Sequence, residues 1–141
     1  EINAAFLWAQ LENLEAIQAK RKDIWKQYYD GLKDLKEQGC FRMPDIPDYA
    51  TNNAHMFYLV CRNLEERTGL IAYLKENGIT APFHYLALHK SEYYLNHCDL
   101  RPALPNCDMY ADCLVRLPMY YELELEQVDE IVTHIREYYN V

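Results

Sequence analysis

The chain has 141 residues, a length typical of one domain. Hydrophobic residues make up 50% of it and charged residues 26%, and the formal net charge at pH 7 is -8. An acidic chain without a clustered basic face is not expected to bind nucleic acid. Its apolar runs are shorter than the ~20 residues that a membrane-spanning helix needs.

Residues 1–38 carry one apolar stripe with helical periodicity and predict a single long helix. Gly31 is the candidate for a bend, and Gly39 for the end of the helix. Such a helix is longer than a small globule needs. We therefore expect residues 1–10 to pack against something outside this chain, and the helical start without a methionine suggests a fragment of a longer protein. The stripe consists of Leu7, Leu11, Leu14, Ile17, Ile24, Tyr28, Leu32 and Leu35.

The rest of the chain alternates between strand and helix patterns. Turn residues predict a loop over 40–54, and a second loop-like stretch covers 87–106. Strands are expected at 55–61, 79–86 and 115–119, the middle one irregular because it contains Pro82. Helices are expected at 64–77 and 124–139, with one or two helical turns at 107–114. Together with the first helix, these elements predict an α/β fold: a two-layer α+β sandwich with about three strands covered on one face by helices.

The polar cluster with the highest density follows the second predicted strand. His84, Tyr85 and His89 lie where a loop can present them, and imidazole and phenol groups can both bind sugar hydroxyls or phosphate oxygens. Spacing alone is unspecific, because a packed histidine beside a surface histidine without a ligand is the more common arrangement. That these residues bind a ligand is therefore a hypothesis, and their spacing alone cannot decide it.

Other chemistry finds no support in the pattern. The spacings of His97, Cys98, Cys107 and Cys113 match no common zinc motif, so we predict no metal site. No signature of a cysteine nucleophile and no glycine-rich phosphate loop is present. The five cysteines are odd in number and form no CxxC pair, which indicates reduced thiols and a cytoplasmic location.

Six segments in the same order resemble the DegT/DnrJ/EryC1/StrS family of sugar aminotransferases. The opening helix is similar to the family's "SELQAA...AQL", and later segments are similar to "LI.YLKE.GI", "HY.PLH" and "RLPLY". The resemblance covers nearly the whole chain and departs from the family at Ala87, where a proline is usual, and over residues 90–113. It is carried by residues 1–11, Lys20-Arg21-Lys22 with Tyr28, residues 53–58, residues 70–79, Phe83-His84-Tyr85 with Leu88-His89, and residues 116–120.

The resemblance implies the type I fold of pyridoxal-phosphate (PLP) transferases, with residues 1–141 as its C-terminal small domain. In that family the PLP-binding lysine and the acid that pairs with the cofactor belong to the large domain. We therefore expect no catalytic residue and no PLP site in this chain, which should be inactive alone. The resemblance implies that His84, Tyr85 and His89 face the substrate, with His55 as a weaker candidate.

One branch of the family, the dTDP-4-amino-4,6-dideoxygalactose transaminases, is most similar at Ile46-Pro47-Asp48 and residues 53–58. This implies a homodimer that transfers an amino group from glutamate to C4 of dTDP-4-keto-6-deoxyglucose, a nucleotide sugar, for surface polysaccharide. Two alternatives stay open. The intact protein could be a sugar dehydratase of the same family, in which histidine replaces the lysine, or the chain could be a free-standing α/β binding or regulatory module.

Overall fold

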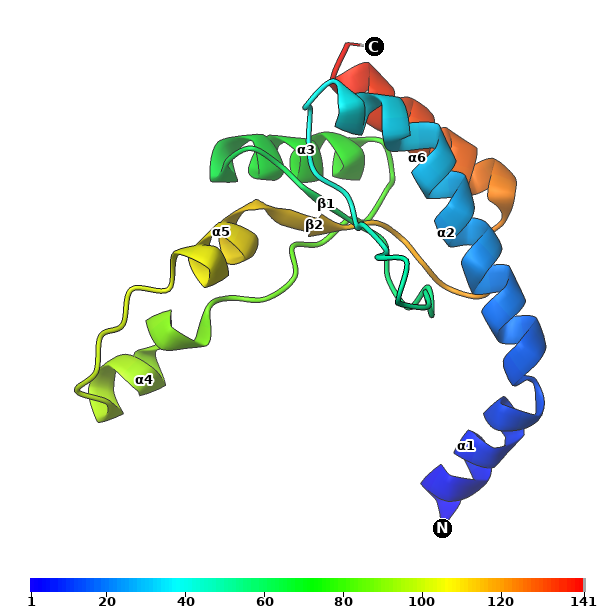
Figure 1. The fold of residues 1–141 in the computed structure, drawn as a ribbon, viewed down its shortest axis with the longest axis horizontal. Helices are drawn as coiled ribbons and strands as arrows, with labels where there is room; N and C mark the ends of the chain where they lie inside the picture. Colours follow the sequence, from blue (N-terminus) through cyan, green and yellow to red (C-terminus); the bar gives the residue numbers. More distant parts are fainter. Residues whose placement is uncertain (141) are drawn as a thin grey trace.

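Helices α2 (Leu14–Glu37) and α6 (Leu125–Tyr138) form the frame of the molecule in the computed structural model, which describes residues 1–140 (Figure 1). They lie side by side, and an ion pair of 2.7 Å between Arg136 and Asp34 joins them at the surface. Both helices repeat apolar residues every three or four positions, so that each presents one face to the core. The buried residues of this frame are Ile24, Tyr28, Leu32, Leu35, Val128, Ile131, Val132 and Ile135.

The single helix predicted over residues 1–38 is wrong, because the structure divides it at Asn13. Helix α1 (Ile2–Glu12) ends there, and α2 begins at the next residue. The Asn13 side chain donates to the Ala9 carbonyl at 3.1 Å, and its backbone has left the helical region. Asparagine disrupts helices in this way, because its side chain competes for backbone hydrogen bonds.

Gly31 marks a close contact between helices, and α2 continues through it without ending. A Cβ atom at this position would lie 2.9 Å from a Val132 methyl group on α6. The helix end predicted at Gly39 agrees with the structure more closely than the bend predicted at Gly31. Helix α2 ends at Glu37, and Gly39 has a φ of 77°. Only glycine adopts this left-handed conformation without strain.

The sheet is smaller than predicted. Strands β1 (Tyr58–Val60) and β2 (Leu114–Arg116) pair antiparallel, with Leu59 opposite Val115. The third strand, expected at 79–86, is reduced to one isolated bridge between Phe83 and Val115. Pro82 has no N–H to donate, so a regular ladder cannot pass through it.

Helix α3 (Leu64–Glu76) covers the sheet beside α6, and Asn63 caps it by accepting from the Glu66 N–H at 2.9 Å. This helix and α6 confirm the two predicted at 64–77 and 124–139. The structure therefore confirms the α/β class, with helices on a short sheet. The domain is mostly helical, and a pair of strands takes the place of the three expected.

The loop expected over 87–106 is also wrong in part. It contains the 3-10 turn η1 (Leu88–Lys90) and helix α4 (Glu92–His97), and α5 begins at Pro105 and ends at Cys113. Ser91 caps α4 by accepting from the Tyr94 N–H at 3.2 Å. Within residues 1–140, no helix combines the length and apolar character that a bilayer crossing requires.

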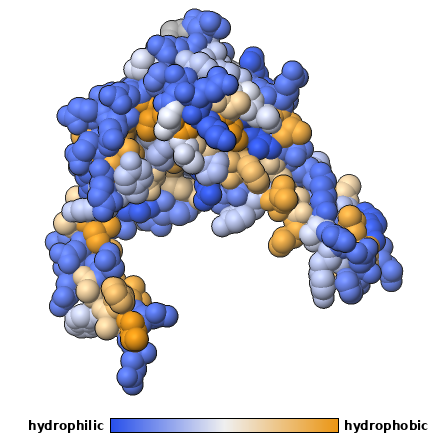
Figure 2. Space-filling model, turned by 180° about the vertical axis from the view of Figure 1, so that it is seen from behind, coloured by the Kyte–Doolittle hydropathy of each residue, from blue (hydrophilic) through white to orange (hydrophobic). Residues whose placement is uncertain are grey.

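Two projections extend from the core toward the same side (Figure 1). The N-terminal arm (residues 1–13) buries no residue, and the pocket arm (residues 84–104) exposes several large side chains. Figure 2 shows apolar groups on both projections. Exposed apolar residues include Ile2, Phe6, Leu7, Trp8 and Leu11 on the first arm and Tyr85, Leu86, Leu88, Tyr93 and Leu100 on the second.

Candidate functional site

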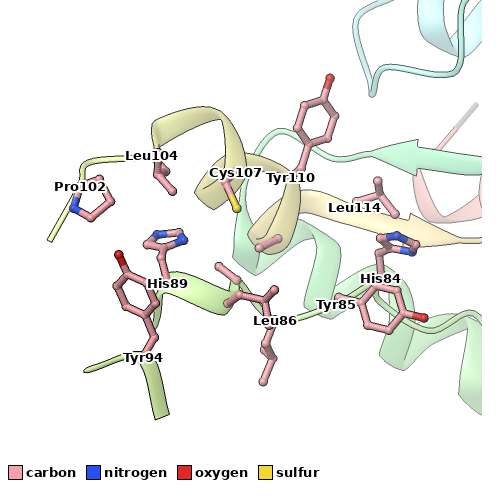
Figure 3. A pocket seen from close by; sticks show the side chains of 13 residues that line it. His84, Tyr85, Leu86, His89, Tyr94, Pro102, Leu104, Cys107, Tyr110 and Leu114 are labelled. Carbon is pink, nitrogen blue, oxygen red and sulfur yellow. The ribbon is translucent and has the colours of Figure 1, made fainter. Parts of the chain in front are cut away.

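A pocket of about 570 Å³ opens between the pocket arm and helix α5 (Figure 3). One side comes from the segment that includes η1 and the start of α4, and the other from the chain around α5. Aromatic and aliphatic groups dominate the lining, and histidine, tyrosine and cysteine supply its polar atoms. The lining consists of His84, Tyr85, Leu86, Ala87, Leu88, His89, Tyr94, Pro102, Leu104, Cys107, Tyr110, Ala111 and Leu114.

His89 connects the two sides of this pocket. Its Nε2 lies 3.1 Å from Oδ1 of Asp108 on α5, and its side chain is only 12% exposed. The neighbouring Lys90 places Nζ 2.6 Å from the same oxygen. Lys90 holds the pKa of the Asp108 carboxyl below its usual value, although desolvation opposes this effect and His89 adds to it. Asp108 is therefore an ionised anchor for η1.

Asp108 is a site residue that the sequence did not reveal. Its contacts with His89 and Lys90 join positions far apart in the chain, and no local spacing predicts such a contact. The only local signal is an acidic residue in the first turn of α5, where a helix N-terminus favours negative charge. That signal is common and would not have singled out this residue.

His84 and Tyr85 lie at the other end of the pocket, next to strand β2 (Figure 3). Their rings meet edge to face with centroids 4.5 Å apart. The Arg116 guanidinium lies 5.9 Å from the centre of the Tyr85 ring, within the range of a cation–π contact. The neighbouring Phe83 ring has an equivalent partner, Arg67, at 5.2 Å.

The structure brings together three of the four residues expected to face the substrate. His84, Tyr85 and His89 all line the pocket, whereas His55 is exposed in the loop before β1 and is not part of the lining. Arg21 on α2 holds the His55 loop by donating to the carbonyl oxygens of Ala54 and His55. Whether any of these residues binds a substrate stays a prediction.

The pocket does not have the residues that would hold PLP. A PLP enzyme of this kind needs a lysine for the Schiff base and an acid for the pyridinium nitrogen. No lysine, aspartate or glutamate contributes to the lining. The nearest lysine along the chain, Lys90, is paired with Asp108 instead. No chemical step through the cofactor can therefore be assigned to this chain.

A metal centre is not formed by the described residues either. Within residues 1–140 no group of three histidine, cysteine, aspartate or glutamate side chains is arranged to bind an ion. All five cysteines are free thiols, and burial raises the pKa of Cys61 to about 12. The apolar lining with its histidine and tyrosine groups suits an organic ligand that combines apolar surface with hydrogen-bonding groups.

The model of the DegT/DnrJ/EryC1/StrS aminotransferase family matches residues 1–136, nearly the full length of the chain. The chain belongs to this family. The match includes the whole pocket, both projections and most of helix α6. The resemblance expected from six short segments is therefore confirmed at the level of the family, whose members depend on PLP.

Several solved structures share the fold. The chain aligns with DesV of S. venezuelae in complex with a ketimine intermediate at a TM-score of 0.84 and 25% identity, covering 96% of this chain and 35% of that one. It aligns with a DegT DnrJ EryC1 StrS aminotransferase of Brucella abortus at 0.81 and 26% identity, covering 98% and 35%.

A third structure shows the fold alone. The chain aligns with PseC of Helicobacter pylori, an aminotransferase involved in the biosynthesis of pseudoaminic acid, at a TM-score of 0.81 and 20% identity, with coverages of 94% and 35%. The chain spans about a third of the length of each of these proteins.

Proposed function

We propose that residues 1–141 are the C-terminal small domain of a PLP-dependent sugar aminotransferase. The observation that carries this proposal is the family match over residues 1–136 in a chain that spans about a third of its structural relatives. In this proposal the remaining part of the intact enzyme supplies the lysine and the acid that the pocket lacks. PLP would then supply the amino-transfer chemistry, and this domain would supply binding groups.

The two projections support a role as one part of a larger structure. Phe6 and Trp8 on the N-terminal arm are 70% and 67% exposed, and Leu88 on the pocket arm is 82% exposed. Apolar surface of this extent is unfavourable in water and typical of surfaces that another domain covers. In the proposed enzyme, the large domain and the second subunit of a homodimer cover these arms.

The pocket arm would form one wall of the substrate cleft. We propose that the substrate is a nucleotide sugar and the amino donor glutamate, with dTDP-4-keto-6-deoxyglucose as the acceptor. The pocket combines the aromatic rings of Tyr85 and Tyr94, at its two ends, with hydrogen-bonding groups at His84 and His89. Apolar sugar faces and ring hydroxyls are recognised by such a combination.

The first experiment is the absorption spectrum of the intact protein, before and after glutamate is added. We expect a yellow protein with bound PLP whose colour glutamate removes. A protein that binds PLP but does not respond to glutamate would favour the dehydratase of the same family. A colourless protein that takes up no PLP would contradict the proposal and favour a free-standing binding module.

The role of the pocket needs a separate test in the intact enzyme. The substitution His84→Ala should raise the KM for the nucleotide sugar roughly tenfold while PLP stays bound, because it removes one hydrogen-bonding group from a ligand contact. His134→Ala is the matched control, since His134 lies on α6 and pairs with Glu137 at 3.1 Å, outside the pocket. Equal kinetics for the two variants would remove His84 from the site.

A further inference from the structure

Unsatisfied polar groups occur in the pocket lining and beside it. Within residues 1–140, buried side-chain nitrogen and oxygen atoms without a hydrogen-bond partner occur at His84 Nδ1, Asp108 Oδ1 and Arg116 Nε. The Asp108 oxygen is compensated by the nearby charge of Lys90. The other two atoms are not compensated, and an unsatisfied buried group usually indicates a missing partner such as an ion or a ligand.

Arg116 is exceptional among the arginines of the chain. In the part of the chain that the structure describes, its guanidinium donates no hydrogen bond and forms no ion pair, although it is half-buried. A partly desolvated charge without a counter-ion or hydrogen-bond acceptor is costly, and the chain has 22 acidic residues that could have supplied one. Every other arginine donates at least one side-chain hydrogen bond, namely Arg21, Arg42, Arg62, Arg67, Arg101 and Arg136.

The surroundings of Arg116 place its side chain beside Tyr85, which lines the pocket. Its backbone N–H donates to the Pro82 carbonyl at 2.9 Å, which fixes β2 against the segment that carries His84 and Tyr85. The Tyr85 ring lies 5.9 Å from the guanidinium carbon and meets the His84 ring at its edge. Unpaired polar atoms from a strand and from a loop therefore lie on the two sides of Tyr85, a residue that lines the pocket.

We propose that Arg116 and His84 form an oxyanion-binding site at this end of the pocket. A guanidinium donates two parallel hydrogen bonds to a carboxylate or a phosphate, and an imidazole N–H can add a third. The ligand is thus a group with at least two anionic oxygen atoms. Two substrates of the proposed function could supply this group: the nucleotide sugar through its pyrophosphate, and glutamate through a carboxylate. In this respect the inference rests on the proposed function.

The test is a calorimetric titration of the intact protein with two probes, inorganic pyrophosphate and glutarate, a dicarboxylate that carries no amino group to transfer. We expect Arg116→Gln to weaken the binding of at least one probe by roughly tenfold or more, the usual effect of losing a charged hydrogen bond. Arg67→Gln is the matched control. It removes the same charge from a neighbouring aromatic contact, but Arg67 Nε already donates to the Asp112 carbonyl at 2.9 Å.

The pattern of lost binding identifies the ligand of the site. A loss confined to pyrophosphate assigns the site to the nucleotide, a loss confined to glutarate assigns it to the amino donor, and a loss of both assigns a site for oxyanions in general. If Arg116→Gln and Arg67→Gln weaken probe binding equally, the loss of one positive charge explains the effect and the proposal is overturned. A wild-type protein that binds neither probe would also overturn it. Arg116→Lys serves if the glutamine variant does not fold, because it keeps the charge and should lose only the paired hydrogen bonds.

The test is independent of the cofactor. A protein that takes up no PLP but binds pyrophosphate through Arg116 would contradict the proposed function and keep the oxyanion site. If the protein binds PLP and responds to glutamate, but binds both probes equally well with and without Arg116, the proposed function stands and the oxyanion site is refuted. Melting curves by circular dichroism establish that each variant is folded before it is titrated.

Discussion

His89 and Asp108 lie on opposite sides of the pocket, with Nε2 and Oδ1 3.1 Å apart. Asp108 also forms an ion pair with Lys90. This contact holds η1 against α5 and so sets the distance between the two sides. The same arm carries His84 and Tyr85. Their positions in the pocket therefore depend on Asp108, which is not itself a lining residue.

Asp108→Asn should loosen that anchor, because it removes the charge that holds His89 and Lys90. We expect hydrogen exchange of the backbone amides in η1 to accelerate at least roughly two- to fivefold, the size expected from the loss of a surface ion pair. Asp112→Asn on the same helix is the control, since its carboxylate has no ion-pair partner within residues 1–140. Exchange rates equal to wild type in the first variant would contradict the anchoring role.

Gly31→Ala should destabilise the domain although alanine favours helices by about 1 kcal/mol. The added methyl group would lie 2.9 Å from Val132, and such overpacking costs about 1–3 kcal/mol. In a Val132→Ala background the same substitution should become stabilising, because the space is open. A urea-unfolding cycle of the four proteins measures this coupling, and an unchanged sign in the second background would refute it.

The Arg136–Asp34 ion pair should give the domain an acid-sensitive contribution to stability. Arg136 holds the pKa of the Asp34 carboxyl below its ordinary value of 3.8, so the contribution is complete above that value and disappears as the pH falls through the lowered pKa. Asp34→Asn should therefore destabilise by about 1 kcal/mol at neutral pH and have no effect in strong acid. Denaturant unfolding across this pH range checks the prediction, with the exposed Asp23→Asn as control.

The cysteines should differ sharply in reactivity. Burial raises the pKa of the Cys61 thiol to about 12, and that residue is 3% exposed, whereas Cys107 is exposed at the pocket. Since the thiolate is the reactive form, iodoacetamide should label Cys107 in the folded protein and reach Cys61 only in denaturant. Peptide mass spectrometry separates the two sites. Early labelling of Cys61 would mean that β1 opens readily.

The N-terminal arm should drive self-association of the 141-residue chain. Replacing Phe6 and Trp8 with serine should lower the associated fraction in sedimentation experiments, because these side chains are exposed and apolar. The melting temperature should stay the same, since α1 buries no residue. Tyr49→Ser, at a residue that is 92% exposed on a different loop, is the control. Association that survives the double substitution would locate the contact elsewhere.

Strong helical periodicity made most of the fold predictable. The apolar faces of α2, α3 and α6 and the paired segments of β1 and β2 follow from residue spacing, since the buried side of each element repeats at its own period. The break at Asn13 does not follow, because the stripe continues through it. The short helix α4 was missed because Ser91 and Glu92 give only a weak signal for a helix start in a stretch that contains two prolines.

The candidate site was predictable only where its residues are close in sequence. His84, Tyr85 and His89 share one segment, and the structure places them on one pocket. Asp108 and Arg116 act across long separations, one against η1 and the other against the Tyr85 ring. Such pairings depend on how α5 and β2 pack, and no sequence period encodes them.

Phe83 and Val115 are neighbours in the sheet, yet the whole pocket arm and α5 lie between them in the chain. The segment therefore leaves the sheet and returns to it at nearly the same point. Insertions, deletions or replacement of residues 84–104 leave those two attachment points unchanged, and longer connections cost little extra closure entropy. Changes in this segment therefore alter the pocket while the core behind it stays the same.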